Sequence, residues 1–530
     1  MTAAQLAPSA APGPSGFEQA ARSANETGTL GYLCSSQGGI ALAVSAAATN
    51  SGPSGLNLTV PANLASNEAL QQISEIAWAY VATYPLPLVA KSLASVSANG
   101  TAINTFHASN DHLANYNDTG GVTPNHDTLY NQAFLDLSQG PQVISVPKFD
   151  TPSRYWIVPF LDAYLNYYGA VGSDFNSSSG NYLVVGPGEP EGATYGNFTK
   201  DRIFYSPTDI NWVIGRVLVL NDSDLARAYT FSKQYAVAPF NPAVNVSRDP
   251  SSKAALISKA FGGSGYGSYK NPSGYLDGFS QHPAQWFNGS LQFLEIDPPA
   301  NESEVLLETV SSLSALANSG EENESFQLGQ QVAKQCILNG ATSLITNSGW
   351  TFHNTSGDYT NFADGYTDYL LRAQDTRYIP AALPASQVIY FQTLEDSQGR
   401  ALDASTGDNY TLTFQIPVPA RAFWSLTIYN ATNLLMFQNV IDRYNIADRT
   451  NNLYYTGANN DTLQVFISAS EPATTNVYRN WLPAPKNAPF LLILRTYVPP
   501  RYATDGQYAP PSIVRVSASN SQSSAASAGK

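Results

Sequence analysis

Residues 125–130 carry an unusual density of side chains that could do chemistry. Asn125, His126, Asp127 and Tyr130 bring an amide, an imidazole, a carboxylate and a phenol together, directly before the apolar run 133–137. Two glycines and a proline precede them, which predicts a loop at the rim of a β-domain, where sites tend to form. Groups this dense belong to a site or to a buried hydrogen-bonded network. The candidate catalytic residues are Asn125, Asp127, Tyr130 and Arg154.

Three of the five histidines lie within residues 107–126. His107, His112 and His126 alternate with carboxylates, and this composition could form a metal site. None of their spacings matches the i, i+4 pair of one helix face, and histidines in clefts are more often hydrogen-bonded polar residues. We therefore expect no metal, keep the three histidines as an alternative metal set, and treat His107 and His126 as candidate binding residues.

Asp136 and Asp162 lie inside apolar runs, where an unpaired charge would be costly. Arg154 is the nearest candidate partner, so a buried Asp–Arg pair that holds the strand register is the favoured interpretation for both. Asp127 lies in a polar, loop-like segment instead. It is predicted to face solvent at a site, so that Asp127→Asn would leave the stability unchanged.

The elements around these residues are mostly strands. Short β-rich runs fill 121–220 and 388–515, and helical spacing predicts helices at 66–84, 222–234, 302–318 and 324–347. The predicted fold is mainly β, with two tandem β-sandwich or jelly-roll-like domains and a few intervening helices. The predicted divisions are a flexible segment (1–55), a β-rich domain (56–300), a helical connector (301–385), a β-sandwich (386–516) and a disordered tail (517–530).

The segments 125–137 and 154–162, followed far along the chain by 422–429, 443–444, 480–485 and 494–499, carry a resemblance. In type and order they are similar to a widespread, mostly bacterial family built from two domains of unknown function, numbers 1254 and 1214. This resemblance implies the same two-domain β architecture but no activity, since a fold does not dictate chemistry.

In the second half, the resemblance is carried by an aromatic and basic signature, from which Trp424, Asn480 and Trp481 are taken as candidate binding residues. Arg443 and Arg495 belong to the same signature. The alternative for the two tryptophans is that they are core anchors whose indole N–H groups are satisfied.

Composition limits the partners. The chain has 530 residues with a net charge of −14, and 12% of its residues are aromatic. An acidic protein is a poor match for nucleic acid or an anionic membrane, and no apolar segment is long enough to span a bilayer. A small molecule or a carbohydrate is the expected ligand, and an oligomer is possible.

Asn-x-Ser/Thr sequons are about twice as frequent as the composition predicts, which favours a secreted glycoprotein with N-glycans. A signal peptide is not visible. The fifteen sequons begin at Asn25, Asn57, Asn99, Asn117, Asn176, Asn197, Asn221, Asn245, Asn288, Asn301, Asn323, Asn354, Asn409, Asn430 and Asn460. The two cysteines, Cys34 and Cys336, could form one disulfide in an oxidising compartment or remain two buried thiols.

No nucleophile elbow, phosphate-binding glycine loop, zincin helix or dinucleotide fingerprint occurs, so we expect no cofactor. Three functions remain. The first is binding or transformation of a neutral, hydroxyl-rich or aromatic small molecule in a rim pocket near 125–130. The second is a structural, capsid-like double jelly roll, and the third is a metal-dependent enzyme that uses the histidines.

Overall fold

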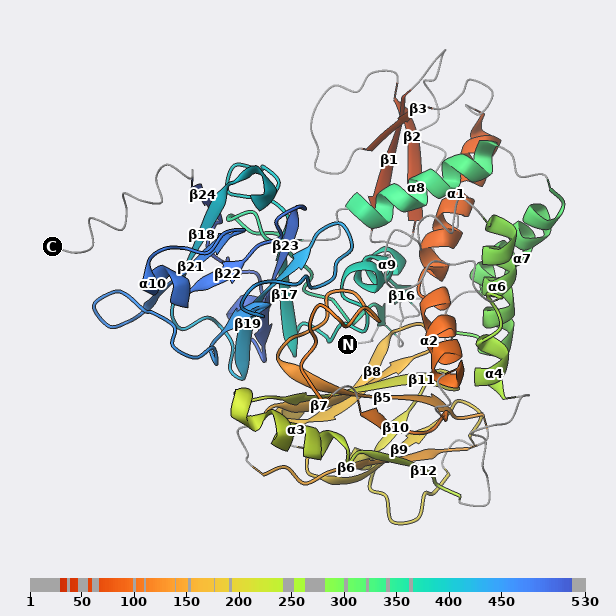
Figure 1. The fold of residues 1–530 in the computed structure, drawn as a ribbon. Helices are drawn as coiled ribbons and strands as arrows, with labels where there is room; N and C mark the ends of the chain where they lie inside the picture. Colours follow the sequence, from red (N-terminus) through yellow and green to blue (C-terminus); the bar gives the residue numbers. More distant parts are fainter. Residues whose placement is uncertain are drawn as a thin grey trace, which may run out of the picture.

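The computed structural model describes residues 29–35, 39–45, 56–59, 66–98, 102–108, 111–138, 140–150, 154–175, 177–189, 193–241, 252–262, 282–299, 304–320, 324–339, 344–361 and 366–516. These form two β-sandwiches, one yellow and one blue in Figure 1, and a helical layer in orange and green. The mainly β fold that the sequence predicts is confirmed. In the described part of the chain, no helix combines the length and the apolar character needed to cross a membrane.

The N-terminal sandwich packs a five-stranded sheet on a four-stranded sheet, and side chains such as Leu135 and Val184 share one core between them. The first sheet runs β4 (His107–Ala108), β5 (Thr128–Asp136), β11 (Ile210–Leu218), β7 (Trp156–Asp162), β8 (Tyr167–Gly172). The second runs β10 (Ile203–Tyr205), β9 (Gly180–Val185), β6 (Gln142–Val146), β12 (Ala236–Pro239). Helix α3 (Leu225–Ser232) adds Ala228 to the core.

The C-terminal sandwich has the same two-layer plan. Its six-stranded sheet runs β13 (Leu344–Ile345), β14 (Thr351–Phe352), β17 (Val388–Thr393), β23 (Phe490–Tyr497), β19 (Phe423–Asn430), β20 (Asn445–Ala447). The four-stranded sheet runs β22 (Trp481–Pro483), β21 (Thr462–Ser468), β18 (Asn409–Gln415), β24 (Val514–Val516). Strand β23 is buried along its whole length because Leu492 and Leu494 face the sandwich core while Leu491 and Ile493 face the other domain.

The helical layer is assembled from separate parts of the chain around one apolar core that includes Tyr80, Trp286 and Val332. Its helices are α1 (Asn67–Thr83), α2 (Leu86–Ala98), α4 (Lys253–Ile257), α6 (Pro283–Ile296), α7 (Glu304–Asn318), α8 (Glu324–Asn339) and α9 (Tyr369–Tyr378). The predicted connector 301–385 therefore supplies only part of this layer. The helices expected at 66–84, 222–234, 302–318 and 324–347 correspond to α1, α3, α7 and α8.

Helix α1 ends at Thr83, just before Pro85, and α2 begins at Leu86 with Pro87 in its first turn, where the missing N–H costs nothing. Within the segment 1–55 that is predicted to be flexible, strands β1 (Thr29–Ser35) and β2 (Gly39–Ser45) form a sheet with β3 (Leu56–Thr59).

The two sandwiches form one packed body. Phe423 and Tyr497 of the C-terminal sandwich stack with ring centroids 3.8 Å apart, and Tyr155 of the N-terminal sandwich meets both rings edge-on at 5.4 Å. These rings belong to an apolar cluster with members from both domains.

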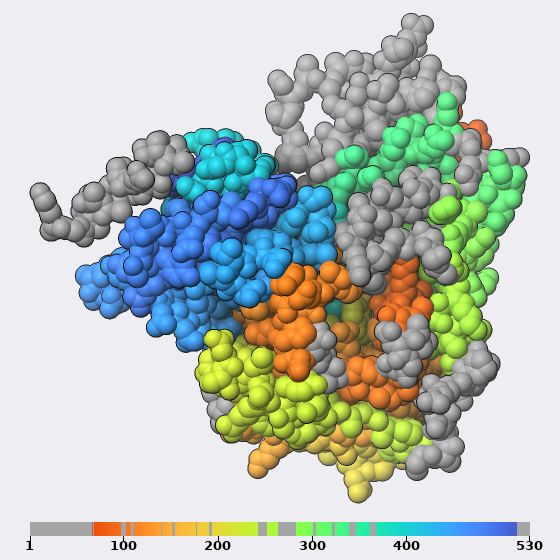
Figure 2. Space-filling view, viewed as in Figure 1, coloured from red at the N-terminus to blue at the C-terminus, as the bar shows by residue number. Residues whose placement is uncertain are grey.

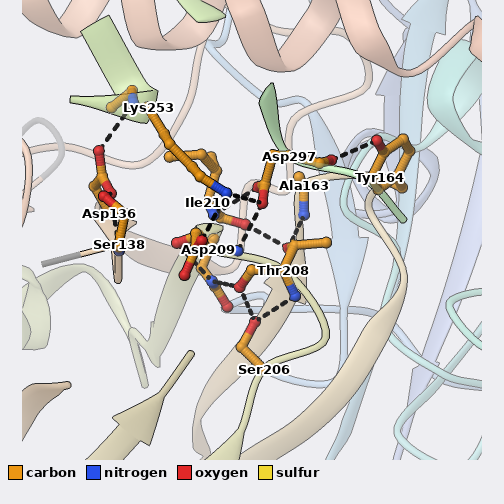
Figure 3. Close-up of polar contacts among 12 residues, drawn as sticks. Asp136, Ser138, Ala163, Tyr164, Ser206, Thr208, Asp209, Ile210, Lys253 and Asp297 are labelled. Atoms are coloured by element: carbon orange, nitrogen blue, oxygen red, sulfur yellow. Dashed lines mark hydrogen bonds and ion pairs between the residues drawn. The ribbon is translucent and has the colours of Figure 1, made fainter. Parts of the chain in front are cut away.

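A buried polar network fixes the start of β11 against the helices (Figure 3). The Asp297 carboxylate, 1% exposed, accepts the N–H groups of Asp209 and Ile210 at 2.9 and 2.8 Å. Lys253 lies 2.7 Å from an Asp209 carboxylate oxygen and 3.5 Å from Asp297. Burial raises the pKa of Asp297 to about 7, against the opposing effect of its two N–H donors and Lys253. This network positions a strand that carries site residues.

Candidate functional site

A cavity of about 400 Å³ lies where both sandwiches meet the helical layer. Its walls are one face of β5 and β11, one face of α2, the strands β17 and β23, and the loop before β5. Figure 2 shows the surface hollowed between that loop, in orange, and α2, in orange-red. The cavity thus lies between domains and is not confined to the rim of one sandwich.

Alternate residues of β5 and β11 form one wall. Tyr130 and Arg216 are partners in the strand register and both line the cavity. Their neighbours Leu129 and Val217 belong to the sandwich core. Because successive side chains of a strand point to opposite faces, the same strands build the core and the cavity wall. The cavity side comprises Thr128, Tyr130, Gln132, Phe134, Trp212, Ile214 and Arg216.

The opposite walls come from the C-terminal sandwich and from α2. Tyr390 on β17 pairs in register with Arg495 on β23, and Arg495 and Tyr497 are two residues apart, so all three lie on one face of that sheet. On α2 the lining residues are Leu88, Ser92, Ser95 and Val96, whose spacing of four, seven and eight residues defines one helix face.

The cavity has a flat aromatic part. The rings of Phe134 and Trp212 stack with centroids 5.4 Å apart and planes 18° from parallel. The Trp212 indole N–H donates to the Gln132 side-chain oxygen at 3.2 Å, which holds the ring in place. A planar or apolar ligand group could pack against this surface.

The predicted cluster contributes two residues to the wall. Asn125, buried, donates its backbone N–H to the Tyr130 hydroxyl at 3.2 Å and its side-chain amide to the Tyr497 hydroxyl. Asn125 therefore links the hydroxyls of both sandwiches. Whether Asn125 and Tyr130 take part in catalysis stays a prediction.

Two buried arginines also line the cavity. Arg495, 2% exposed, donates to the Thr123 carbonyl oxygen at 2.8 Å and to the Tyr429 hydroxyl at 2.9 Å. Arg216, 5% exposed, donates from Nη2 to the Ala381 carbonyl oxygen at 2.9 Å, whereas its Nη1 has no hydrogen-bond partner among the described residues.

The backbone beside Arg495 is strained. Thr123 has a φ of 42°, a left-handed conformation that a β-branched residue rarely adopts. Its N–H donates to the Leu434 carbonyl at 2.8 Å, its carbonyl accepts from Arg495, and its hydroxyl donates to the Tyr378 carbonyl. Strain of this kind persists where surrounding contacts over-determine it, as it does at many binding sites.

Asp127 does not face solvent, so the prediction of an exposed site carboxylate is wrong. Its side chain is buried, with Ser425 donating to Oδ2 at 2.6 Å and Asn445 donating to Oδ1 at 2.9 Å. Arg449 completes an ion pair with Oδ1 at 2.6 Å. All three partners belong to the C-terminal sandwich. Asp127 therefore joins the domains behind the cavity and is not a free general base.

Arg154 pairs with neither Asp136 nor Asp162, in contrast to the prediction. Its guanidinium, fully buried, binds Asp224 through two N–H groups at 2.6 and 2.7 Å and Asp150 at 3.1 Å. Arg154 also donates to the Leu218 carbonyl oxygen at the end of β11, at 2.8 Å, and it does not line the cavity. The geometry gives it a structural role.

The carboxylates of Asp136 and Asp162, which lie in apolar runs, accept hydrogen bonds from nearby groups. Asp136 accepts from Ser138 and from the N–H of Ala254, in the first turn of α4 (Figure 3). Asp162 accepts from Tyr164 and Asn166 N–H groups, each at 2.8 Å. Hydrogen bonds from backbone N–H groups and from the side chains of Ser138 and Asn166 compensate the two carboxylates, and Arg372 adds a favourable charge near Asp162.

The structure does not assemble the three histidines. His112 lines the cavity and contacts Asp111 and Asp118 through its two ring nitrogens, at 3.3 and 3.1 Å. His126 contacts the Ala114 carbonyl oxygen at 2.5 Å and lies edge-on to a tyrosine ring. Burial lowers the pKa of His107 and of His126. The described residues contain no group of three or more His, Cys, Asp or Glu side chains that could hold a metal ion.

Comparisons with known proteins agree with the two-part architecture. Residues 103–239 match the family model "Protein of unknown function (DUF1254)", and residues 387–501 match "Protein of unknown function (DUF1214)". The chain therefore contains a DUF1254 domain followed by a DUF1214 domain, in the order that the resemblance implied. The cavity lies between these two domains and takes side chains from both.

A solved structure supports the fold alone. The VPA0106 protein from Vibrio parahaemolyticus is 21% identical, with a TM-score of 0.52 over 84% of this chain and 100% of that chain. An uncharacterized protein from Burkholderia cenocepacia is 10% identical, with a TM-score of 0.40 over 86% of this chain and 91% of that chain. No curated protein matches the chain.

The predicted DUF1214 binding residues lie away from the cavity. Trp424 packs in the C-terminal core against Phe414, and the buried Trp481 donates its indole N–H to the Ser468 carbonyl oxygen at 3.1 Å. Asn480 bridges the backbone of Tyr454 and neighbouring β21. These contacts give both tryptophans and Asn480 structural roles, and for the tryptophans this is the alternative that the sequence allowed.

Cys336, on α8, is disulfide-bonded, and the chain contains only one other cysteine. The side chain of that residue, Cys34 on β1, lies outside the described residues.

Eight sequon asparagines belong to the described residues whose burial is known, and all are reachable from solvent. Asn117, Asn197, Asn221, Asn288, Asn354 and Asn460 are exposed, and Asn409 and Asn430 are half-buried. Asn25, Asn57, Asn99, Asn176, Asn245, Asn301 and Asn323 lie outside the residues for which side chains are described.

Proposed function

We propose that this protein binds a small organic molecule in the cavity between its DUF1254 and DUF1214 domains. The observation that supports this proposal is a cavity of about 400 Å³ whose lining includes a flat aromatic wall and buried polar atoms without hydrogen-bond partners among the described residues. Thr128 Oγ1 and Arg216 Nη1 line it without hydrogen-bond partners among the described residues. Ligand sites combine such an apolar lining with a few convergent polar groups, and a buried polar group without a partner is costly until a ligand satisfies it.

Binding is proposed rather than a bond-breaking step. Both carboxylate oxygens of Asp127 already have partners, and Arg154 lies outside the cavity. Asn125 and Tyr130 remain available as hydrogen-bonding groups that orient a ligand.

A cavity-filling variant tests the proposal. Ser92 lines the cavity from α2, so Ser92→Trp should occupy ligand space and weaken binding at least ten-fold. The measurement is a thermal-shift screen of phenols, monosaccharides and aromatic acids with their amides, followed by calorimetry on compounds that stabilise the wild type. The matched control is Ser312→Trp on the exposed face of α7, since both serine hydroxyls donate to a carbonyl four residues earlier. Absence of any stabilising compound, or equal binding by Ser92→Trp, would end the proposal.

Secretion and N-glycosylation are also proposed, supported by the sequon density and by the solvent access of the eight described asparagines. We expect treatment of the natively expressed protein with an N-glycosidase to lower its mass by several glycans. Site mapping should find occupancy at exposed positions such as Asn197 and Asn354 before half-buried Asn430, whose side chain accepts the N–H of Thr432. A mass that does not change would contradict the proposal.

A further inference from the structure

The cavity contains two guanidinium groups that have no carboxylate partner in the part of the chain that the structure describes. Neither Arg216 nor Arg495 makes an ion pair with a described Asp or Glu, although both are at least nine-tenths buried. The two groups are near each other, because Tyr130, Tyr390 and Tyr497 are the electrostatic neighbours of both.

The surrounding tyrosines do not neutralise this charge. Burial raises the pKa of Tyr390 and, well above its ordinary value, that of Tyr497, so both hydroxyls are uncharged at neutral pH. Asp118 lines the cavity too, but its Oδ2 accepts from the Asn115 N–H at 2.9 Å and contacts His112 at 3.1 Å. Asp118 therefore already has partners within the loop before β5.

Arg154 shows the usual arrangement of a buried arginine. It is as deeply buried as Arg495 and has two carboxylate partners, Asp150 and Asp224. The half-buried Arg449 is paired with Asp127 and Asp448. A buried charge without a partner is costly, so an arginine that lacks one commonly serves a ligand. Arg216 meets this description most clearly because one of its donors is unpaired.

We infer that the ligand is an organic acid, whose oxyanion is bound by Arg216 and Arg495 and whose apolar or aromatic body packs on Phe134 and Trp212. This inference rests on the proposed function, and it replaces the neutral ligand that the sequence favoured. A planar guanidinium matches the two oxygens of a carboxylate, and Tyr130 and Asn125 lie beside it as further polar contacts.

The test compares 2-naphthoate with 2-naphthamide, which differ in charge but hardly in shape. Calorimetry on the wild type should show the acid binding at least ten-fold more tightly than the amide. Arg216→Met should abolish this preference, whereas Arg216→Lys, which keeps the charge, should retain part of it. Equal affinities for acid and amide would overturn the inference and leave the proposed cavity function standing. Failure of both compounds, together with an empty screen, would overturn both.

Thermal stability supplies a readout that a structural arginine would not give. Because Arg216 is buried without a counter-ion, Arg216→Met should raise the melting temperature of the ligand-free protein by a few degrees. Arg154→Met, which removes an ion-pair partner of Asp150 and Asp224, should lower the melting temperature. A fall in melting temperature for Arg216→Met comparable to that for Arg154→Met would show that Arg216 serves the fold and would overturn the inference.

Discussion

Asp127→Asn is expected to lower the free energy of unfolding by about 3 kcal/mol, the lower end for a broken buried ion pair, because Arg449 keeps a second partner in Asp448. Asp127 accepts hydrogen bonds from Ser425 and Asn445 and pairs with Arg449, so one neutralised carboxylate affects three residues of the other domain. Arg449 cannot move freely to solvent, because it is 17% exposed and its guanidinium carbon lies 4.5 Å from the centre of the Phe423 ring. Denaturant unfolding would measure the loss.

Asp505→Asn is the matched control. Asp505 pairs with Arg501 on the surface, where the side chains are 48% and 92% exposed, so the same chemical change should alter stability very little. Adding Arg449→Met to Asp127→Asn should not restore the loss, because Asp448, which Arg449 also binds at 2.5 Å, is then left without its partner. If Asp127→Asn unfolds like the control, the ion pair does not hold the two domains together.

The sequence located the site better than it assigned the roles within it. The cluster 125–130 does border the cavity, but only Asn125 and Tyr130 line its wall, while the Asp127 side chain contacts the other domain. Asp127 directly precedes β5, and the partners of its carboxylate are hundreds of residues away, at Ser425 and Arg449. Its local sequence is polar because these distant groups satisfy it, not because water does. A single sequence holds no signal for such partners.

The cavity arginines illustrate the same limit. Arg216 lies in Ile210–Leu218, where Trp212, Ile214 and Arg216 alternate with core residues, and this period-two pattern could have marked a second functional face. Arg495 belongs to the family signature, but the sequence of β23 is a nearly continuous apolar run because both faces of the strand are buried, so its pattern does not mark a cavity face. What makes the two arginines a site is their juxtaposition across the domain interface, which local periodicity does not encode.

Helices were predictable where caps and spacing agreed. Ser66 accepts the Ala69 N–H at 3.2 Å and begins α1 as expected. Helix α9 was missed because it is mostly polar: Arg372, Gln374 and Asp375 are buried in it, so its sequence lacks an apolar stripe. Tertiary partners stabilise this helix.

One of those buried residues should make stability depend on pH. Asp375 is 2% exposed, and burial raises its pKa to about 7 although the Tyr359 hydroxyl donates to it at 2.8 Å. No described Lys, Arg or His forms an ion pair with it. The folded pKa lies above the ordinary value of 3.8, so between these two values the native state binds the extra proton. Stability therefore falls as the pH rises from about 4 to about 7.

Asp375→Asn should remove this contribution, because an amide resembles the protonated carboxyl in shape and carries no charge at any pH. A pKa difference of about three units corresponds to roughly 4 kcal/mol, so the stability of the variant relative to wild type should increase by roughly this amount between pH 4 and pH 8. Urea unfolding of both proteins across that range measures the difference in stability. Other buried carboxyls, such as Asp162, whose pKa burial raises to about 6, contribute equally to both proteins and cancel in this difference. Asp505→Asn should run parallel to wild type throughout. A difference that shrinks with rising pH would mean that Asp375 is stabilised as a carboxylate by its Tyr359 hydrogen bond, and that α9 depends on a buried charge rather than on a buried acid.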